Sequence, residues 1–164
     1  MSHRTRIDLK HLNIVKIITV NKKASYNFLI SEIYEAGLIL TGGEVKSLRI
    51  NSSSIKESYV IEKNGELWLS NCHIKKYSSS NHIENDSVRE KKILVKKKEL
   101  NKIIGASKKN GMSIIPLKMY FNDRGFAKIS IGLGKGKKLH DKRESIKNKE
   151  WGLKKQRMLK KRSI

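Results

Sequence analysis

The sequence contains one cysteine, Cys72, one proline and few aromatic residues. A single cysteine excludes an internal disulfide and a zinc site built from cysteines, and it fits a reducing compartment. No run of 18 or more apolar residues is present, so the sequence predicts no membrane-spanning helix. The opening residues have only a superficial likeness to a signal peptide, because Asn13 and Lys16 interrupt the apolar stretch and no small-residue cleavage site follows. We therefore expect a cytoplasmic protein.

The sequence also has few residues arranged for catalysis. Its five histidines are scattered, and none forms a metal pair at helical spacing with another histidine or with an acid in a recognisable motif. Cys72 and His73 are neighbours on a predicted strand, where adjacent side chains point to opposite faces. The segment "GLGKGKK" lacks the spacing and the Ser or Thr of a phosphate-binding loop. The sequence therefore predicts a protein without catalysis, metal or cofactor, and it disfavours a metal-free nuclease.

Acidic residues are few compared with basic ones. The 164 residues include 37 Lys and Arg but only 15 Asp and Glu, which gives a formal net charge of +22. A field of this strength repels itself unless a polyanion is near. Nucleic acid is therefore the leading class of partner.

An apolar segment near the start predicts a strand buried on both faces. Tyr26, Phe28 and Ile30 would lie on one side of an extended chain, with Leu29 and Ile33 on the other.

A short helix is predicted directly after that strand. Thr41 and Glu44 have the spacing of a capping box, in which each residue satisfies a backbone N–H of the other. The helix would bury Val45 and Leu48.

Two β-hairpins are predicted from their turn residues. Asn64 and Gly65 separate two strand-like runs, and this dipeptide tolerates the positive φ angles of a type I′ turn. The second hairpin turns at residues 122–125. Pro116 in its first strand lacks a backbone N–H and favours an edge or a bulge there.

The region between the hairpins predicts a long polar loop over residues 75–91 and then a helix. Asn110 and Gly111 supply the signal that ends the helix. The apolar residues at helical spacing are Ile93, Leu94, Leu100, Ile103 and Ile104.

Together these elements predict a mainly β protein, an antiparallel barrel of about six strands with small helices. Small, partly open barrels commonly bind single-stranded or looped nucleic acid. We expect a flexible N-terminal arm at residues 1–20, an RNA-binding barrel at 21–134 and a basic C-terminal tail at 135–164.

The C-terminal tail is unusually basic. Residues 135–164 hold 13 Lys and Arg but 3 Asp and Glu, which leaves +10. As a helix it would show only a narrow stripe of Leu139, Ile146 and Leu153, with Trp151 and Met158 far round the other side. The pattern predicts a tail that is disordered or loosely helical when free and that becomes ordered on a polyanion.

Several aromatic residues lie close to lysines in the sequence, and such rings can stack on unpaired bases. Most aromatic residues in strands belong to the core, whereas Trp151 has no core to join. We expect core positions for Tyr26, Phe28, Trp68, Tyr120 and Phe121.

Four strings resemble one known family. "YEAGLILTGGEVKSLR", "NGELWLSNCHI", "PLKMYFNDRGFAKISIGLGKGKKLHDKR" and "KEW" occur in the order seen in the SsrA-binding proteins of bacteria, also called small protein B (SmpB). The resemblance runs from about Asn21 to the end of the chain.

The resemblance implies an oligonucleotide-binding (OB) barrel that grips the tRNA-like part of transfer-messenger RNA (tmRNA, SsrA). It implies an adaptor of trans-translation, a monomer that acts with elongation factor Tu at a stalled 70S ribosome. The tail would become helical in the empty mRNA channel near the decoding centre.

The resemblance also implies roles for individual residues. The residues linked to RNA binding are Asn21, Lys22, Lys23, Glu35, Leu94 and Lys128. The residues that act afterwards at the ribosome are Gly136, Lys137, Lys138, His140, Asp141, Lys142, Arg143, Trp151, Met158 and Leu159.

Composition alone supports a structural ribosomal or rRNA-binding protein equally well. The adaptor differs because it predicts separable functions. Changes at Glu35 or Lys128 should weaken RNA binding, whereas changes at residues 141–143 should spare binding and block ribosome rescue.

Overall fold

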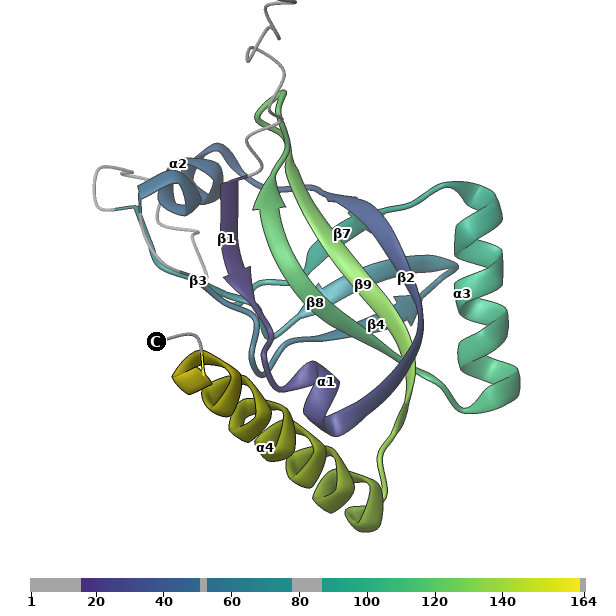
Figure 1. Cartoon of the computed structure of the whole chain (residues 1–164). Coiled ribbons are helices and arrows are strands. Elements are labelled where there is room, and N and C mark those ends of the chain that lie inside the picture. The colour runs from purple at the N-terminus through teal and green to yellow at the C-terminus, as the bar shows by residue number, and fades with distance from the viewer. Residues whose placement is uncertain (1–15, 51–52, 78–86, 163–164) are drawn as a thin grey trace, which may run out of the picture.

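The chain folds around one strongly curved antiparallel sheet (Figure 1). The structure is a computed structural model that describes residues 16–50, 53–77 and 87–162. Seven strands form the main sheet in the order β1-β8-β9-β2-β7-β5-β4, and β3 and β6 form a small second sheet. The strands are β1 Lys16–Val20, β2 Phe28–Leu38, β3 Ser53–Ser54, β4 Tyr59–Lys63, β5 Glu66–Ser70, β6 His73–Ile74, β7 Lys91–Leu94, β8 Ser113–Phe121 and β9 Ala127–Gly136.

Four helices accompany the sheet: α1 Ala24–Asn27, α2 Gly42–Ile50, α3 Lys97–Asn110 and α4 Leu139–Arg162. The sheet curves so that β4 comes into contact with β8, although no hydrogen-bonded pairing joins these two strands within the described ranges. The prediction of a mainly β, antiparallel protein with small helices is confirmed.

The core lies inside the curved sheet. Strands β5 and β9 supply much of it through side chains with at most 1% exposure, including Leu67, Leu69, Ile129 and Ile131. Helix α3 contributes Ile103, which is fully buried. Burial of such aliphatic side chains, about 1.5–3 kcal/mol each, is the main favourable contribution to folding.

Several local predictions are confirmed. The Thr41 hydroxyl accepts from the Glu44 N–H at 3.3 Å, and the Glu44 carboxylate accepts from the Thr41 N–H at 2.8 Å, so the capping box of α2 is complete. Asn64 and Gly65 have φ angles of 53° and 76°, as a type I′ turn requires. Gly111 ends α3 in the left-handed region with φ of 57°.

The second hairpin also forms as predicted, from β8 and β9. The pairing register of the two strands shifts between Pro116 and Lys118, so the proline sits at a bulge, one of its two predicted settings.

The N-terminal boundary differs from the prediction. Residues 16–20 form β1, which pairs with β8 and lies at one edge of the sheet, because the backbone of β8 offers hydrogen-bonding groups on that side. The rest of the predicted arm, residues 1–15, lies outside the described residues.

The first predicted strand is not buried on both faces. Tyr26 belongs to α1, and β2 alternates between partly buried and exposed side chains. Leu29 and Ile33 are 67% and 65% exposed. One face of β2 packs inward while the other faces solvent, as is common in antiparallel sheets.

The helix predicted from residue 93 begins later. Ile93 and Leu94 pair with Leu38 and Gly37 of β2, so they belong to β7, and α3 starts only at Lys97. The helical spacing of the apolar residues predicted the wrong element here, because the pairing of this segment with β2 depends on residues distant in the sequence.

The predicted loop over residues 75–91 ends in a buried strand residue. Lys91 is fully buried, and its ammonium group donates to the carbonyl oxygens of Cys72 and Arg89 at 3.2 and 2.8 Å. It also lies 3.6 Å from the Glu44 carboxylate, which Arg89 contacts as well. This network ties α2 to β7. Residues 78–86 of the loop lie outside the described residues.

Candidate nucleic-acid interface

A row of residues crosses the outer face of the sheet on four neighbouring strands. Leu94 of β7 stands opposite Gly37 of β2, Gly37 stands opposite Lys128 of β9, and Lys128 stands opposite Tyr120 of β8. Glu35 is two residues from Gly37 on β2, so it faces the same side. Three residues that the sequence implicated separately, Glu35, Leu94 and Lys128, therefore meet on one surface.

The carboxylate of Glu35 is held from two sides. The Tyr120 hydroxyl donates a hydrogen bond to Glu35 Oε2, and the Lys128 ammonium group lies 3.2 Å from Glu35 Oε1. Lys118 stacks its ammonium group over the Tyr120 ring at 5.1 Å from the centroid. The Glu35 side chain is still 59% exposed, so it remains accessible to a partner.

These contacts shift the ionisation of the pair in opposite directions. The hydrogen bond from Tyr120, followed by that from Lys128, lowers the pKa of Glu35 below its ordinary value of 4.5. Burial, followed by the hydrogen bond to Glu35, raises the pKa of Tyr120 to about 12. At neutral pH the site therefore presents an ionised carboxylate, which accepts hydrogen bonds such as those of base amino groups.

An open groove adjoins this row. It has a volume of about 560 Å³ and joins Leu94 and Lys128 to the β8–β9 turn. Phe126 is 64% exposed at this turn, and an exposed ring of this kind can stack on an unpaired base. The lining residues are Gly37, Leu38, Leu94, Asn122, Asp123, Arg124, Phe126, Ala127 and Lys128.

Sequence reasoning missed three residues of this interface. The sequence predicts only a turn at residues 122–125, so it does not identify Arg124, or Phe126 directly after the turn, as residues of the groove. An aromatic residue directly after a polar turn was the available signal for Phe126. The sequence predicts a core position for Tyr120, and its ring is buried, but only the strand order shows that its hydroxyl reaches Glu35.

The other residues predicted to bind RNA are Asn21, Lys22 and Lys23. One of them is buried and two are exposed. Asn21 is only 9% exposed, and its side-chain amide donates to the Pro116 carbonyl at 3.1 Å. Lys22 and Lys23 are exposed beside it, and Lys23 pairs with Glu57 at 3.4 Å. Asn21 therefore fixes the backbone before α1 against β8, while the two lysines face solvent.

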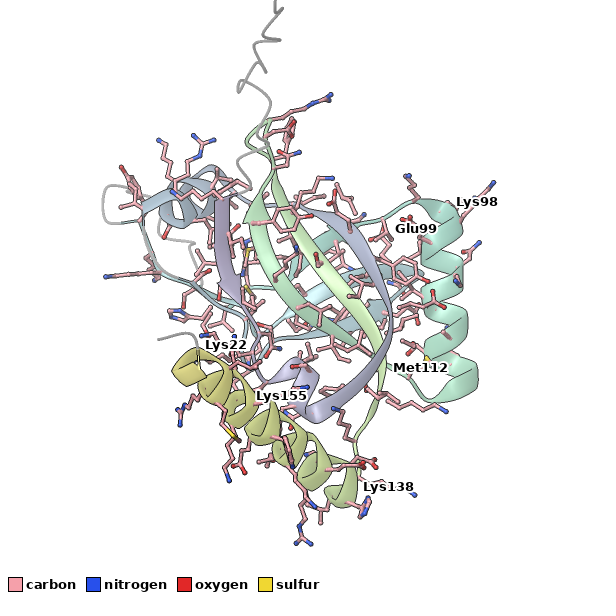
Figure 2. The ribbon with its side chains drawn as sticks, in the orientation of Figure 1. Lys22, Lys98, Glu99, Met112, Lys138 and Lys155 are labelled. Atoms are coloured by element: carbon pink, nitrogen blue, oxygen red, sulfur yellow. The ribbon has the colours of Figure 1, made fainter. Side chains whose placement is uncertain are left out.

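The cationic side chains are spread over separate parts of the surface. Lys22 lies between β1 and α1, Lys138 directly precedes α4, and Lys98 projects from α3 on another side of the sheet (Figure 2). Charge alone therefore does not select one binding face.

The first part of the predicted tail leaves β9 and starts α4. Gly136 is exposed at the end of β9, and His140 and Arg143 are exposed in the first turns of α4. Asp141 accepts a hydrogen bond from the Lys138 N–H at 3.1 Å, so it caps the start of the helix.

The rest of the tail is a continuous helix to Arg162 in the structure, whereas the sequence favoured a disordered or loosely helical segment. Trp151, Met158 and Leu159 are 57–60% exposed on it. Trp151 and Met158 line a shallow depression with Lys147, Glu150 and Lys154, because residues seven apart lie on one face of a helix. The predicted disorder of the free tail stays a prediction.

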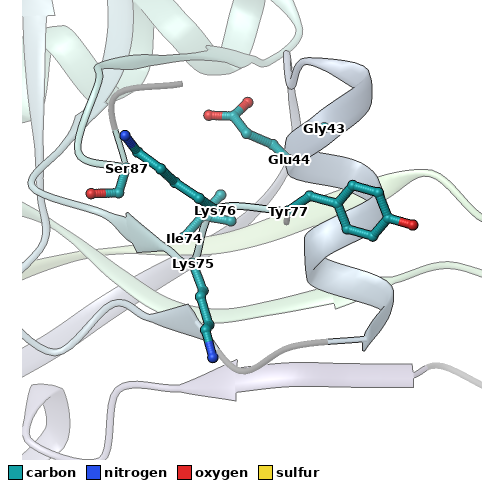
Figure 3. Close-up of a pocket in the computed structure, with 7 residues that line it drawn as sticks. All are labelled: Gly43, Glu44, Ile74, Lys75, Lys76, Tyr77 and Ser87. Atoms are coloured by element: carbon teal, nitrogen blue, oxygen red, sulfur yellow. The ribbon is translucent and has the colours of Figure 1, made fainter. Parts of the chain in front are cut away.

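A second hollow, between α2 and residues 74–77, is much smaller. Figure 3 shows its lining residues, with Glu44 projecting from α2 toward this segment. Its volume of about 10 Å³ is at the lower limit for one water molecule. It is therefore no site for a nucleobase.

The parts of the chain that the structure describes contain no cluster of three or more His, Cys, Asp or Glu side chains suited to a metal ion. Within the same parts, no helix is long and apolar enough to cross a membrane.

Comparison with known proteins identifies the family. The model of the SmpB protein family matches residues 18–161. An SsrA-binding protein of Sinorhizobium fredii is 50% identical, over 91% of this chain and 94% of its own length. An SsrA-binding protein of Bartonella henselae is 48% identical, over 92% of this chain and 96% of its own length.

A solved structure shares the fold. It is described as "tmRNA-SmpB: a journey to the center of the bacterial ribosome", and its chain is 38% identical with a TM-score of 0.63. The similarity covers 79% of this chain and 94% of that chain. With the family match over most of the sequence, these similarities establish that the chain belongs to the SmpB protein family.

Proposed function

We propose that this protein is an RNA-binding adaptor of trans-translation. It binds the tRNA-like domain of transfer-messenger RNA and promotes delivery of that RNA to stalled ribosomes. The names of its relatives and the description of the solved tmRNA-SmpB structure support this function. The observation that carries it is the meeting of Glu35, Leu94 and Lys128 on one exposed face beside an open groove.

The chemistry of this face suits a folded RNA with unpaired bases. Lys128 and Arg124 supply positive charge for phosphates, and Phe126 supplies a ring for stacking, worth roughly 1–3 kcal/mol per base. Glu35 repels phosphate and instead accepts hydrogen bonds from base amino groups. A face with both kinds of group selects among RNAs better than a uniformly cationic one, because phosphate contacts carry no sequence information.

The tail has a separate role in this proposal. Helix α4 enters the empty mRNA channel and contacts ribosomal RNA near the decoding centre. Its excess of positive charge favours such a polyanionic channel. The exposed Trp151, Met158 and Leu159 provide apolar contacts there.

The protein acts as a monomer in the cytoplasm, together with elongation factor Tu in the delivery complex. It contributes binding and positioning rather than a catalytic step.

Binding of the full chain to transfer-messenger RNA tests the proposal, with ordinary tRNA and a random duplex as competitors at near-physiological salt. Lys128→Glu should lower the affinity at least about tenfold and reduce the slope of log affinity against log salt by about one if Lys128 contacts a phosphate. Lys98→Glu, on α3, makes the same change of charge at a residue that does not line the groove and is the matched control.

A chain that selects transfer-messenger RNA and loses affinity only in Lys128→Glu supports the adaptor. Equal binding to all three nucleic acids, or equal losses in both variants, contradicts it. The charge would then act generically, and a structural ribosomal or rRNA-binding protein would be the better interpretation.

A further inference from the structure

The short helix α1 lies against the beginning of the tail (Figure 1). The backbone N–H of Lys137 donates to the carbonyl oxygen of Asn27 at 2.8 Å. The ammonium group of the same lysine donates to the carbonyl oxygen of Ser25 at 2.9 Å. Two carbonyl groups of α1 therefore hold Lys137, the first residue beyond β9.

A third contact reaches the first turn of α4. The ammonium group of Lys142 lies over the ring of Tyr26, 5.6 Å from the centroid, which is within the range of a cation–π interaction. Asp141, the neighbour of Lys142, caps the start of α4 at Lys138. Contacts next to α1 thus determine both the residue at which α4 begins and the direction in which α4 extends from β9.

The opposite side of α1 is fixed to the barrel. The Asn21 N–H donates to the Leu117 carbonyl at 2.8 Å, and the Ala24 N–H donates to the Asn21 carbonyl at 3.2 Å. Ala24 is 3% exposed. With the side-chain bond from Asn21 to Pro116, these contacts leave α1 little freedom to move relative to β8.

We propose that α1 is a bracket that sets the direction of the tail relative to the RNA-binding barrel, with Tyr26 as a positioning residue. The functional part of this inference rests on the adaptor function proposed above. Under this proposal, Lys137 and Lys142 act at the root of the tail through contacts with the protein itself, in addition to any contact with RNA.

The geometry of a long helix makes this root important. Helix α4 has 24 residues and is therefore about 36 Å long. A tilt of about 10° at its root displaces the far end by on the order of 6 Å, more than one helical turn. Apolar residues such as Trp151 and Met158 reach a defined place on a large partner only if the first turn is held.

Distances between spin labels in the full chain test the bracket directly. Labels at Lys98→Cys on α3 and Glu144→Cys on α4 report the direction of the helix root, and Cys72→Ala removes the buried native thiol. We expect one narrow distance distribution in the parent and a broadened one after Tyr26→Leu.

Two control variants separate the ring contact from general effects on folding. Tyr26→Phe keeps the ring and should keep the narrow distribution. Tyr59→Leu removes another exposed tyrosine ring, on β4, which lines a hollow beside Ala24 and Asn27 but is not the ring that Lys142 covers, and it should also keep the narrow distribution. Lys137→Met removes the ammonium bond to Ser25 and should broaden the distribution by a second route.

A functional assay tests the role of Tyr26 independently of the label distances. In a ribosome-rescue tagging assay, Tyr26→Leu should lower activity by about two- to fivefold, the factor that an exposed cation–π contact supports. Its affinity for transfer-messenger RNA should stay unchanged, and Tyr26→Phe should restore tagging.

A narrow distribution in both Tyr26→Leu and Lys137→Met overturns the bracket. A broadened distribution with normal tagging overturns its role in positioning the tail. If the parent chain does not bind transfer-messenger RNA, the adaptor function fails, but the label distances still decide whether α1 holds the tail.

Discussion

The hydroxyl of Tyr120 donates a hydrogen bond to the carboxylate of Glu35 across β9, the strand that lies between their own strands. Lys128, on β9, lies 3.2 Å from the other oxygen of the same carboxylate. Glu35 is therefore oriented by two neighbours while more than half of its side chain remains exposed. A carboxylate arranged in this way is suited to accept hydrogen bonds from a partner without first losing side-chain freedom.

Tyr120→Phe removes the hydroxyl and leaves the ring, so the core contact of Tyr120 is preserved. Without its donor, Glu35 should become less ordered and its pKa should rise toward 4.5. We expect the affinity for transfer-messenger RNA to fall by about three- to tenfold, corresponding to one hydrogen bond of typical net strength. Titration in a competition binding assay measures this loss.

Tyr34→Phe is the matched control for this variant. The Tyr34 hydroxyl also donates to a glutamate, Glu32, but that carboxylate contacts Lys102 of α3 rather than Lys128. The Tyr34→Phe variant should therefore leave the affinity for transfer-messenger RNA unchanged. An equal loss in both variants would mean that removal of a buried hydroxyl, rather than the orientation of Glu35, weakens binding.

Alkaline pH should weaken the fold through Tyr120. Its pKa is raised to about 12 in the folded chain, whereas the unfolded chain has the ordinary value of 10. Above pH 10 the unfolded state loses this proton first, so the contribution to stability is full below pH 10 and is lost as pH rises toward 12. The wild-type free energy of unfolding should fall more than that of Tyr120→Phe, by on the order of 2 kcal/mol.

Urea unfolding at several alkaline pH values measures this difference, and ultraviolet absorbance of the phenolate identifies the late-titrating tyrosine. Parallel pH profiles for the two proteins would show that Tyr120 titrates normally. Glu35 has the opposite sign: its lowered pKa gives a contribution that is present above 4.5 and is lost as pH falls through the folded value.

Asp141→Ala should separate RNA binding from ribosome rescue. Asp141 accepts a hydrogen bond from the Lys138 N–H at the start of α4 and lies away from the groove at Leu94 and Lys128. Its loss removes a helix cap, so tail helicity and tagging activity should both fall while RNA affinity stays within about twofold of wild type. If RNA affinity falls as strongly as in Lys128→Glu, the two functions are not separable.

The far half of α4 should gain helix when the protein binds a polyanion. Contacts with α1 hold the first turn, but residues beyond it are exposed, and an isolated helix of this kind is marginal in water. Circular dichroism of the full chain should therefore show more helix after a short RNA duplex is added. A chain ending at Lys138, directly before α4, is the control and should show no gain. Full helicity without RNA would contradict the predicted disorder of the free tail.

Short-range features of this protein followed from the sequence because their causes lie within a few residues. The capping box of Thr41 and Glu44, the turn at Asn64 and Gly65, and the end of α3 at Gly111 each depend on local backbone geometry. The excess of positive charge likewise predicted a polyanionic partner without any knowledge of the fold.

The predictions from the sequence were wrong where contacts with residues distant along the chain determined the local structure. Ile93 and Leu94 have helical spacing but pair with β2, and Lys91 looked like part of a polar loop yet is buried against Glu44. Residues 16–20 looked like part of a flexible arm, and β8 provides the edge on which they form a strand.

The sequence by itself determined the turns, the helix caps and the charge, and its resemblance to a family named the residues that we expect to bind RNA. The tertiary structure decided that Glu35, Leu94 and Lys128 share one face and that Tyr120 orients the carboxylate. It also decided that α1 holds the root of the tail. These residues are far apart along the chain, and only the order and register of the strands, together with the contacts of α1 with the tail, bring them together.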